Sequence, residues 1–478
     1  MKKFLFFAAA AVAMLASCSQ NDDISAPVVA ENNDATPVQF GTYVSKSATS
    51  RTTNGTPGST TTAAQLGTNK FGVFAYYTQA TDYANTVSTG SQTPNFMYNQ
   101  PVESADGTTW TYSPVKYWPN DNTTADNANA TGTTNSKVSF FAYSPFVEYA
   151  TVATPAADGI IGMTANTSTY DPTITLKLPT LPTASNVVDL LWGTRGQATY
   201  EEADGTNNTA AVGTTYNVNL TKQEVNEKVN FLFKHALAKF GGSPSAGSLG
   251  GVKIALDLDN VRSTTGNGTN GGSVWDATEN TTIVTVKSVT IANGVASGEG
   301  ALKSQGVFDL ATGTWSSLST DYTFTDTENT SGTGHLNADI FEPAPDPVYN
   351  TTEKYWEKVE NAGKFTGVTT TLTNLYDTKD ALYLIPTGSD MKLNVSITYV
   401  VRTYDGRVAG DYTEVEQTIS KTITISGGLL SNKQYGLNIY LGLTSVKFTA
   451  TVAAWGDDDG TTEAEEREVV DLPINVED

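Results

Sequence analysis

Apolar and polar residues alternate with a period of two along much of this chain. In the segment 137–143, for example, Val138, Phe140 and Ala142 fall on one face. Because successive side chains of a β-strand point to opposite faces of a sheet, this pattern predicts strands with one face on a core and the other in water. The same alternation recurs at residues 174–178, 229–237, 252–258, 393–401, 435–443 and 446–452.

No long amphipathic helix is visible between these segments. Residues 235–240 could form a helical turn, but the alternation of 229–237 runs through them and favours a strand. The intervening stretches at 120–136, 201–215, 262–273 and 312–334 are rich in Gly, Asn and Thr, which predicts surface loops. We therefore expect an all-β chain built from two β-sandwich domains in tandem.

Composition narrows the possible functions. The chain has 478 residues with 28 Lys+Arg against 50 Asp+Glu, a formal net charge of −22, which argues against nucleic acid and anionic membrane as partners. A single Cys excludes a disulfide framework and Cys-ligated zinc, and two His leave little room for a His-based metal cluster.

Catalytic motifs are also missing from the sequence. It contains no G-x-S-x-G, H-E-x-x-H or P-loop, and no G-x-G-x-x-G after a strand. A carboxylate glycosidase is a further alternative because any two Asp or Glu can meet in a fold, but no pair stands out. The chain is predicted to be non-enzymatic and to use no cofactor.

Two His and one acidic turn are candidate binding sites. His235 lies on an apolar strand face, which favours a hydrogen-bonded core residue, and His335 sits in a polar loop. Asp457 to Asp459, followed by Gly460, offer oxygen ligands for calcium but lack the alternating spacing and closing Glu of an EF-hand loop. A solvated acidic turn is favoured, and no metal site is predicted.

Aromatic residues crowd one segment, with Trp110, Tyr112, Tyr117 and Trp118 close together. Exposed rings of this kind could stack on sugars, so a surface glycan-binding protein is an alternative function. Packing in the core is the favoured interpretation.

The N-terminus has the anatomy of a secretory signal. Residues 1–18 read MKKFLFFAAAAVAMLASC, with a basic start, a short apolar core and small residues before Cys18. The end of this stretch resembles a bacterial lipobox, in which the Cys is acylated and becomes the mature N-terminus. Acidic residues follow closely and resemble a surface-export signal, so we expect a lipoprotein on the outer face of the outer membrane.

The predicted domain order follows from these features. Residues 1–17 form a lipoprotein signal peptide and 18–36 a linker without periodicity. The first sandwich is expected at 37–222, the second at 223–468, and a final strand at 469–478.

That final strand looks suited to assembly. Val470, Leu472, Ile474 and Val476 alternate strictly, with Pro473 between them, after a tract at 457–468 dominated by acidic residues and Gly. Proline lacks a backbone N–H, so Pro473 fits an edge or an outward-facing position. The strand could be donated to another subunit or could stay in its own sheet, and the sequence leaves both open.

A similar pattern lies near the N-terminus. Residues 38–44 include Val38, Phe40 and Val44 and precede a Ser/Thr-rich stretch that holds Arg51. Small polar residues around a solitary Arg suit a protease site, although an ordinary loop arginine has the same surroundings. A cut between Arg51 and Thr52 would let the first strand leave its sheet, and a donated strand of the same period could replace it.

The ordered set of motifs resembles the fimbrillins of Bacteroidales, the subunits of type V pili. The segments that carry the resemblance are KYWP at 116–119, VSFFAYSP at 138–145, DLLW at 189–192, FKHALAK at 233–239, LIP at 384–386, KQY at 433–435 and LTSVKF at 443–448, ending at Trp455.

This resemblance implies two transthyretin-like Greek-key β-sandwich domains and a role as a structural subunit of a cell-surface fimbrium. It further implies lipidation at Cys18, trimming by an arginine-specific protease at Arg51, and donation of the strand from Val470 to Val476 to a neighbouring subunit. Expected partners are other fimbrial subunits, the outer membrane through the N-terminal lipid before processing, and a receptor on a host or bacterial surface. A fimbrial tip adhesin, which accepts a strand without donating one, is an alternative.

Processing can be tested directly. N-terminal sequencing of fimbrial material sheared from cells should begin at Thr52, because cleavage after Arg51 releases the assembled subunit from its lipid. An Arg51→Ala variant should stay anchored and unpolymerised. Assembled fibres that begin at Cys18 would contradict this prediction.

Overall fold

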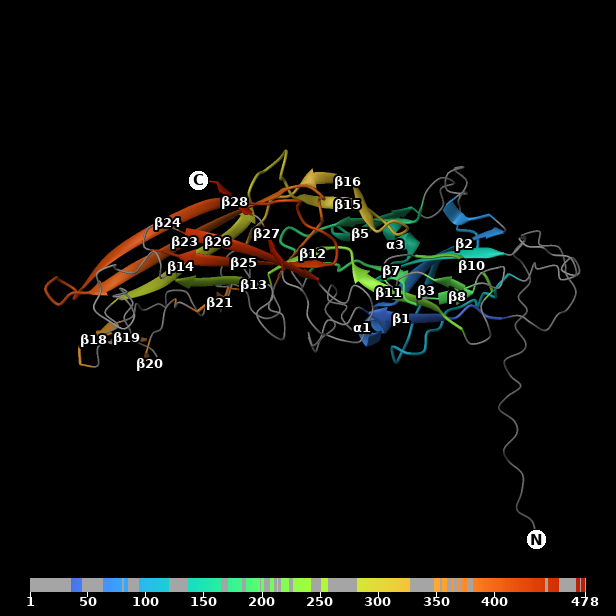
Figure 1. Ribbon diagram of the computed structural model, residues 1–478, viewed down its shortest axis with the longest axis horizontal. Coiled ribbons are helices and arrows are strands. Elements are labelled where there is room, and N and C mark those ends of the chain that lie inside the picture. Colours follow the sequence, from blue (N-terminus) through green and yellow to red (C-terminus); the bar gives the residue numbers. More distant parts are fainter. Residues whose placement is uncertain are drawn as a thin grey trace, which may run out of the picture. The chain divides into compact units, whose positions relative to one another are not determined.

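A computed structural model gives the tertiary structure (Figure 1). It describes residues 36–44, 63–79, 81–84, 94–119, 136–164, 171–182, 186–197, 199–201, 207–209, 213, 216–222, 227–241, 251–256, 282–326, 348–352, 355–358, 363–364, 368, 371–375, 381–442, 446–454, 470–472 and 474–477. The helices α1 (Ala63–Asn69) and α3 (Tyr149–Ala153) are short, and strands dominate the described residues. The prediction of an all-β, sandwich-type fold is confirmed.

The first sheet has seven strands, in the order β1-β11-β7-β4-β2-β3, with β10 also paired to β4. Its first strand is parallel to β11, and the other pairs are antiparallel. The strands are β1 (Phe40–Val44), β2 (Phe71–Gln79), β3 (Met97–Val102), β4 (Lys137–Ser144), β7 (Leu191–Arg195), β10 (Asn217–Leu220) and β11 (Val229–His235).

A four-stranded sheet draws on distant parts of the chain. Its order is β16-β15-β6-β5, formed by β5 (Gly159–Thr164), β6 (Thr173–Lys177), β15 (Lys303–Asp309) and β16 (Thr314–Asp321). Strands from both sides of residues 222 and 223 therefore share this sheet, and the division of the chain there stays a prediction. The expected loop at 312–334 is wrong in part, because Thr314–Asp321 forms β16. This edge strand is mostly exposed and carries few apolar residues, so it leaves no alternation in the sequence.

Two larger sheets form most of the C-terminal half. One has the order β21-β13-β25-β12-β22, with β26 paired to β25 and to β27, and the other has the order β17-β14-β23-β24-β28. The first contains β12 (Ala238–Gly241), β13 (Gly251–Leu256), β21 (Thr373–Asn374), β22 (Ala381–Leu384), β25 (Lys433–Leu441), β26 (Val446–Ala454) and β27 (Val470–Leu472). The second contains β14 (Thr282–Asn293), β17 (Thr325–Asp326), β23 (Met391–Tyr404), β24 (Tyr412–Ile425) and β28 (Ile474–Glu477).

Two small sheets complete the described strands. The first is β18 (Val348–Asn350), β19 (Tyr355–Lys358) and β20 (Gly363–Lys364), and the second is β8 (Thr199–Glu201) with β9 (Asn207–Thr209).

Alternation in the sequence corresponds to burial in the structure. Along β23 the residues from Met391 onward alternate between buried and half-buried. The segment 235–240 is strand on both sides of a bend, since β11 ends at His235 and β12 begins at Ala238. The preference for a strand over a helical turn is confirmed there.

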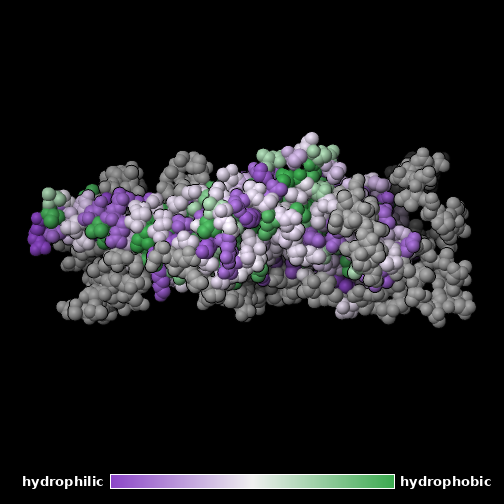
Figure 2. All heavy atoms as spheres, turned by 90° about the horizontal axis from the view of Figure 1, so that it is seen from above, coloured by the Kyte–Doolittle hydropathy of each residue, from purple (hydrophilic) through white to green (hydrophobic). Residues whose placement is uncertain are grey.

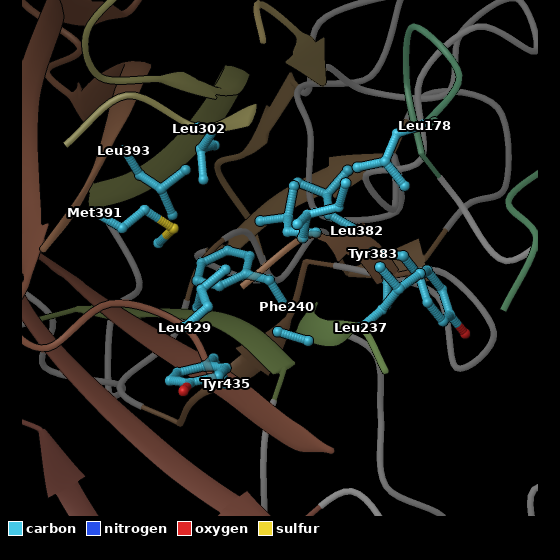
Figure 3. Close-up of a cluster of buried hydrophobic side chains, with 14 of the residues drawn as sticks. Leu178, Leu237, Phe240, Leu302, Leu382, Tyr383, Met391, Leu393, Leu429 and Tyr435 are labelled. Carbon is cyan, nitrogen blue, oxygen red and sulfur yellow. The ribbon is translucent and has the colours of Figure 1, made fainter. Parts of the chain in front are cut away.

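The largest apolar core combines residues from both halves of the chain. Leu178, Leu237 and Leu382 belong to it, together with Phe240 and Met391, and Figure 3 shows how these side chains gather. On the face seen in Figure 2, hydrophobic residues are interspersed in small groups among hydrophilic ones. Among the described residues, most large apolar side chains are buried.

A buried hydrogen-bonded pair ties the end of β11 to the segment just before β7. The Nδ1 atom of His235 lies 2.8 Å from Oδ2 and 3.0 Å from Oδ1 of Asp189, and both side chains are fully enclosed. Burial raises the pKa of the Asp189 carboxyl above its usual value, and the neighbouring His235 opposes that shift. His235 is thus the hydrogen-bonded core residue that the sequence predicted.

We expect Asp189→Ala to lower the free energy of unfolding by about 3–5 kcal/mol, because it leaves the buried imidazole without its carboxylate. Urea unfolding at neutral pH measures the effect. The control is Glu416→Ala, which removes an exposed partner 2.8 Å from Lys287 and should cost no more than about 1 kcal/mol. Equal losses in the two variants would contradict this account of the pair.

Candidate functional site

The segment that contains β1 is held by backbone hydrogen bonds along both of its edges. On one side β1 lies beside β11 (Figure 1) and runs parallel to it. The register places Phe40 beside Val229. On the other side, residues 36–38 meet residues 116–118, where Val38 N donates to Lys116 O at 2.9 Å and Trp118 N donates to Thr36 O at 2.9 Å. The second contact covers only the start of the segment. Among the described residues, the rest of that edge pairs with no strand.

Phe40 lies at the centre of an aromatic cluster. Its side chain is 2 % exposed, and its ring lies 5.4 Å from Tyr112, 6.0 Å from Phe140, 6.0 Å from Phe231 and 6.1 Å from Phe71, between ring centroids. These four rings come from β2, β4, β11 and the segment after β3. Removing β1 would therefore uncover the middle of an apolar core.

Tyr112 fastens the start of the same segment. Its hydroxyl oxygen lies 2.8 Å from the carbonyl oxygen of Val38 and accepts a hydrogen bond from the Lys116 N–H at 3.3 Å. Burial raises the pKa of Tyr112 to about 12, so the phenol keeps its proton and can donate to Val38. Val38 itself is 1 % exposed.

Thr42 places a polar group in the otherwise apolar contact between β1 and the core. Its Oγ1 atom is buried and has no hydrogen-bond partner among the described residues. A buried hydroxyl that makes no hydrogen bond costs stability, whereas an aliphatic side chain at the same place costs none for this reason. The resident strand therefore fills its site imperfectly.

The C-terminal residues form two strands of their own chain. Val470–Leu472 (β27) pairs with β26, placing Val470 opposite Val452. Ile474–Glu477 (β28) pairs with β24, placing Ile474 opposite Ile425. The single strand expected at 469–478 is thus divided between two sheets, and the donation of this strand stays a prediction.

Several predicted sites fall beyond the part of the chain that the structure describes. These are the lipidation site Cys18, the processing site at Arg51 and Thr52, the loop residue His335 and the acidic turn 457–460.

Most aromatic side chains of the segment 110–118 are buried or partly buried. Trp118 is 4 % exposed and packs on Phe140, and Trp110 lies 5.0 Å from the ring of Phe71. Tyr117 is 51 % exposed. The favoured interpretation of core packing is confirmed for Trp118, which is buried, and Trp110 is partly buried and packs against the same apolar cluster.

Sequence reasoning did not single out the partners of Phe40. The alternation marked Phe140 and Phe231 as core residues, but not as neighbours of residue 40. The segment 116–118 was recognised as a motif, and its pairing with residues 36–38 was missed. No signal in a single sequence identifies such contacts, because the residues are distant along the chain.

The described residues contain neither a cluster of metal-ligand side chains nor a membrane-spanning helix. Within them, no group of three or more His, Cys, Asp or Glu side chains comes together as metal ligands would. No helix among them is long and apolar enough to cross a membrane.

The fold and this edge strand define a β-sandwich protein whose first strand fills an aromatic core. No family model matches the chain. A curated relative, the fimbrium subunit Fim1C of Phocaeicola vulgatus, is 29 % identical over 177 residues, which are 37 % of this chain and 39 % of the relative. The match therefore spans well under two thirds of that protein's length.

A solved structure shares the fold. The crystal structure of a fimbrial protein from Bacteroides vulgatus ATCC 8482 superposes with a TM-score of 0.53 at 18 % identity, covering 88 % of this chain and 99 % of that one. Together these matches confirm the resemblance to the Bacteroidales fimbrillins that the sequence motifs carry.

Phe40→Ala should lower the free energy of unfolding by about 3–5 kcal/mol, because it opens a cavity among four rings. Urea unfolding measures the loss, and hydrogen exchange of the β1 amides should become faster. The matched control is Gln39→Ala, at a half-buried neighbour on the other face of the strand, which should change stability little. A Phe40→Ala protein as stable as the control would show that β1 does not fill this core.

Proposed function

We propose that this protein is a structural subunit of a cell-surface fimbrium, exported as a lipoprotein, trimmed by a protease and polymerised by strand exchange. The observation that carries the proposal is the position of Phe40 in β1. An edge strand that fills the centre of a core leaves, once removed, an apolar site of defined length for another strand. The fimbrial proteins that the chain resembles support this choice of function.

Cleavage after Arg51 gives the strand a way to leave. Residues 36–44 precede Arg51, so the cut would separate β1 from the rest of the domain while its contacts stay in place. A covalent tether keeps a segment at high effective concentration beside its site, and a cut removes that advantage. β1 would then be exchangeable with a strand from another subunit.

The C-terminal segment has the pattern that the site requires. Val38, Phe40, Thr42 and Val44 occupy alternate positions in the first strand, and Val470, Leu472, Ile474 and Val476 repeat that spacing. The donated strand would put an aliphatic side chain where Thr42 now buries an unbonded hydroxyl. This removes a cost that the resident strand carries, and so favours exchange.

The remaining roles follow from assembly. Cys18 would carry the lipid that holds the precursor at the outer membrane, and cleavage would release the subunit into the fimbrium. The polymer would support adhesion to a host or bacterial receptor. The subunit needs no catalytic residue and no cofactor for these tasks.

A deletion of residues 469–478 tests the donation. The truncated chain should accept a strand but give none, so it should cap polymers. Mixed in increasing amounts with cleaved full-length protein, it should shorten the ladder of assembled species on denaturing gels run without boiling. A misfolded variant would not cap, which separates loss of donation from loss of fold.

Two point variants sharpen the test. Ile474→Asp should block assembly, because the donated strand would bury a carboxylate in the apolar site. Asn475→Asp adds the same charge on the other face of the strand and should assemble normally. Full-length polymers from the deletion variant alone would overturn the proposal.

A further inference from the structure

We infer that the donated strand enters the site of β1 in the opposite direction, antiparallel to β11, with its donor a second copy of this chain. This inference rests on the proposed function and concerns the orientation of the incoming strand. It follows from the hydrogen bonds of β1 and from the position of Pro473.

The backbone of β1 shows which residues face β11. The carbonyl of Gln39 accepts a hydrogen bond from Val229 N at 2.8 Å, whereas Val38 N donates to Lys116 on the other side. Alternate residues of a strand direct their N–H and C=O groups to the same neighbour. Gln39 and Gly41 therefore turn their backbone groups toward β11, and Val38 and Phe40 turn theirs away.

The side chains of β1 alternate between the core and the opposite face with the same two-residue period as the backbone groups. Val38 and Phe40 are buried in the core, and Gln39 is half-buried on the other face. In β1, therefore, each residue whose side chain points away from the core directs its backbone N–H toward β11.

Pro473 conflicts with this arrangement. It lies midway between Leu472 and Ile474, so it faces outward when the four aliphatic residues face the core. In a strand parallel to β11 it would occupy the place of Gly41 and direct its nitrogen at β11. Proline has no N–H, so β11 would lose a hydrogen bond at the middle of the ladder.

Reversing the strand resolves the conflict. Turning a strand end for end with the same face on the core exchanges its two edges. The aliphatic residues would then bond to β11, and Pro473 would direct its nitrogen away from it. Within the described residues, that edge beyond residues 36–38 pairs with no strand, so the missing N–H costs nothing there.

The reversed register is specific. Val476, Ile474, Leu472 and Val470 would take the places of Val38, Phe40, Thr42 and Val44. In either direction Pro473 replaces Gly41, where a Cβ would lie 2.0 Å from Oδ1 of Asn230, so that flexible side chain must move aside. The direction is therefore decided by the backbone and not by this contact.

Disulfide trapping distinguishes the two directions. The register that pairs Phe40 with Val229 places Gln39 beside Lys228. The reversed strand puts Asn475 at the place of Gln39, and a parallel strand would put Asp471 there. Because Asn475 and Asp471 are four residues apart, about 13 Å along a strand, only one of them can come within disulfide reach of residue 228.

The experiment compares two double variants, Lys228→Cys with Asn475→Cys and Lys228→Cys with Asp471→Cys. Each full-length protein is cleaved after Arg51, assembled and oxidised, and the polymer is analysed on boiled, non-reducing gels. Cleavage removes Cys18, so the new thiols are the only ones present. As a control for reactivity, Gln39→Cys with Lys228→Cys should form a disulfide within the uncleaved chain carrying Cys18→Ser.

We expect a covalent ladder for the Asn475 variant and none for the Asp471 variant. A ladder for the Asp471 variant, for both variants, or for neither in polymer that has assembled would overturn the reversed register. Failure of both variants and of wild type to assemble would instead refute the proposed function. The two ideas thus fail in different ways.

Discussion

Strand β11 is the element on which the other parts of this protein depend. It is buried along nearly its whole length, carries β1 on one edge and pairs with β7 on the other. Its last residue, His235, bonds to Asp189, and the chain passes directly into β12 of a C-terminal sheet. The stretch of backbone from β11 to β12 therefore links the strand that pairs with β1 to a C-terminal sheet.

Hydrogen bonds satisfy the backbone carbonyl groups in the turn between β11 and β12. Ala236 O accepts hydrogen bonds from Trp315 Nε1 at 2.8 Å and from Ser431 Oγ at 2.9 Å, and Asn432 N donates to Leu237 O at 3.1 Å. Buried backbone groups that are fully bonded resist local opening. β1 differs, because among the described residues it pairs beyond residues 36–38 along one edge only. An edge strand thus lies against a buried strand, an arrangement that the proposed exchange of β1 requires.

Much of the negative charge of the chain lies near its C-terminus. Residues 457–478 hold ten acidic residues and one Arg, a net −9 of the chain's total of −22. In the proposed assembly this acidic tract would span from one subunit to the next, and the aliphatic residues that follow it would supply the buried contact.

The sequence by itself determined those strands whose apolar and polar residues alternate, and which of their faces are apolar. Val138, Phe140, Phe231 and Leu393 could be placed on buried faces because the two-residue period of a strand is a local property of the chain. The same period marked Phe40 and Leu472 as members of two matching strands. Strands with little apolar character, such as β16, left no such signal.

Only the tertiary structure decided which strands pair. That Phe40 meets rings from β2, β4 and β11, that residues 36–38 meet 116–118, and that β15 joins β6 across more than a hundred residues could not be derived from periodicity. Any alternating strand can in principle bond to any other, because backbone donors and acceptors are the same in all of them. The choice among partners is made by side-chain packing between residues far apart in the chain, and that packing exists only in the folded molecule.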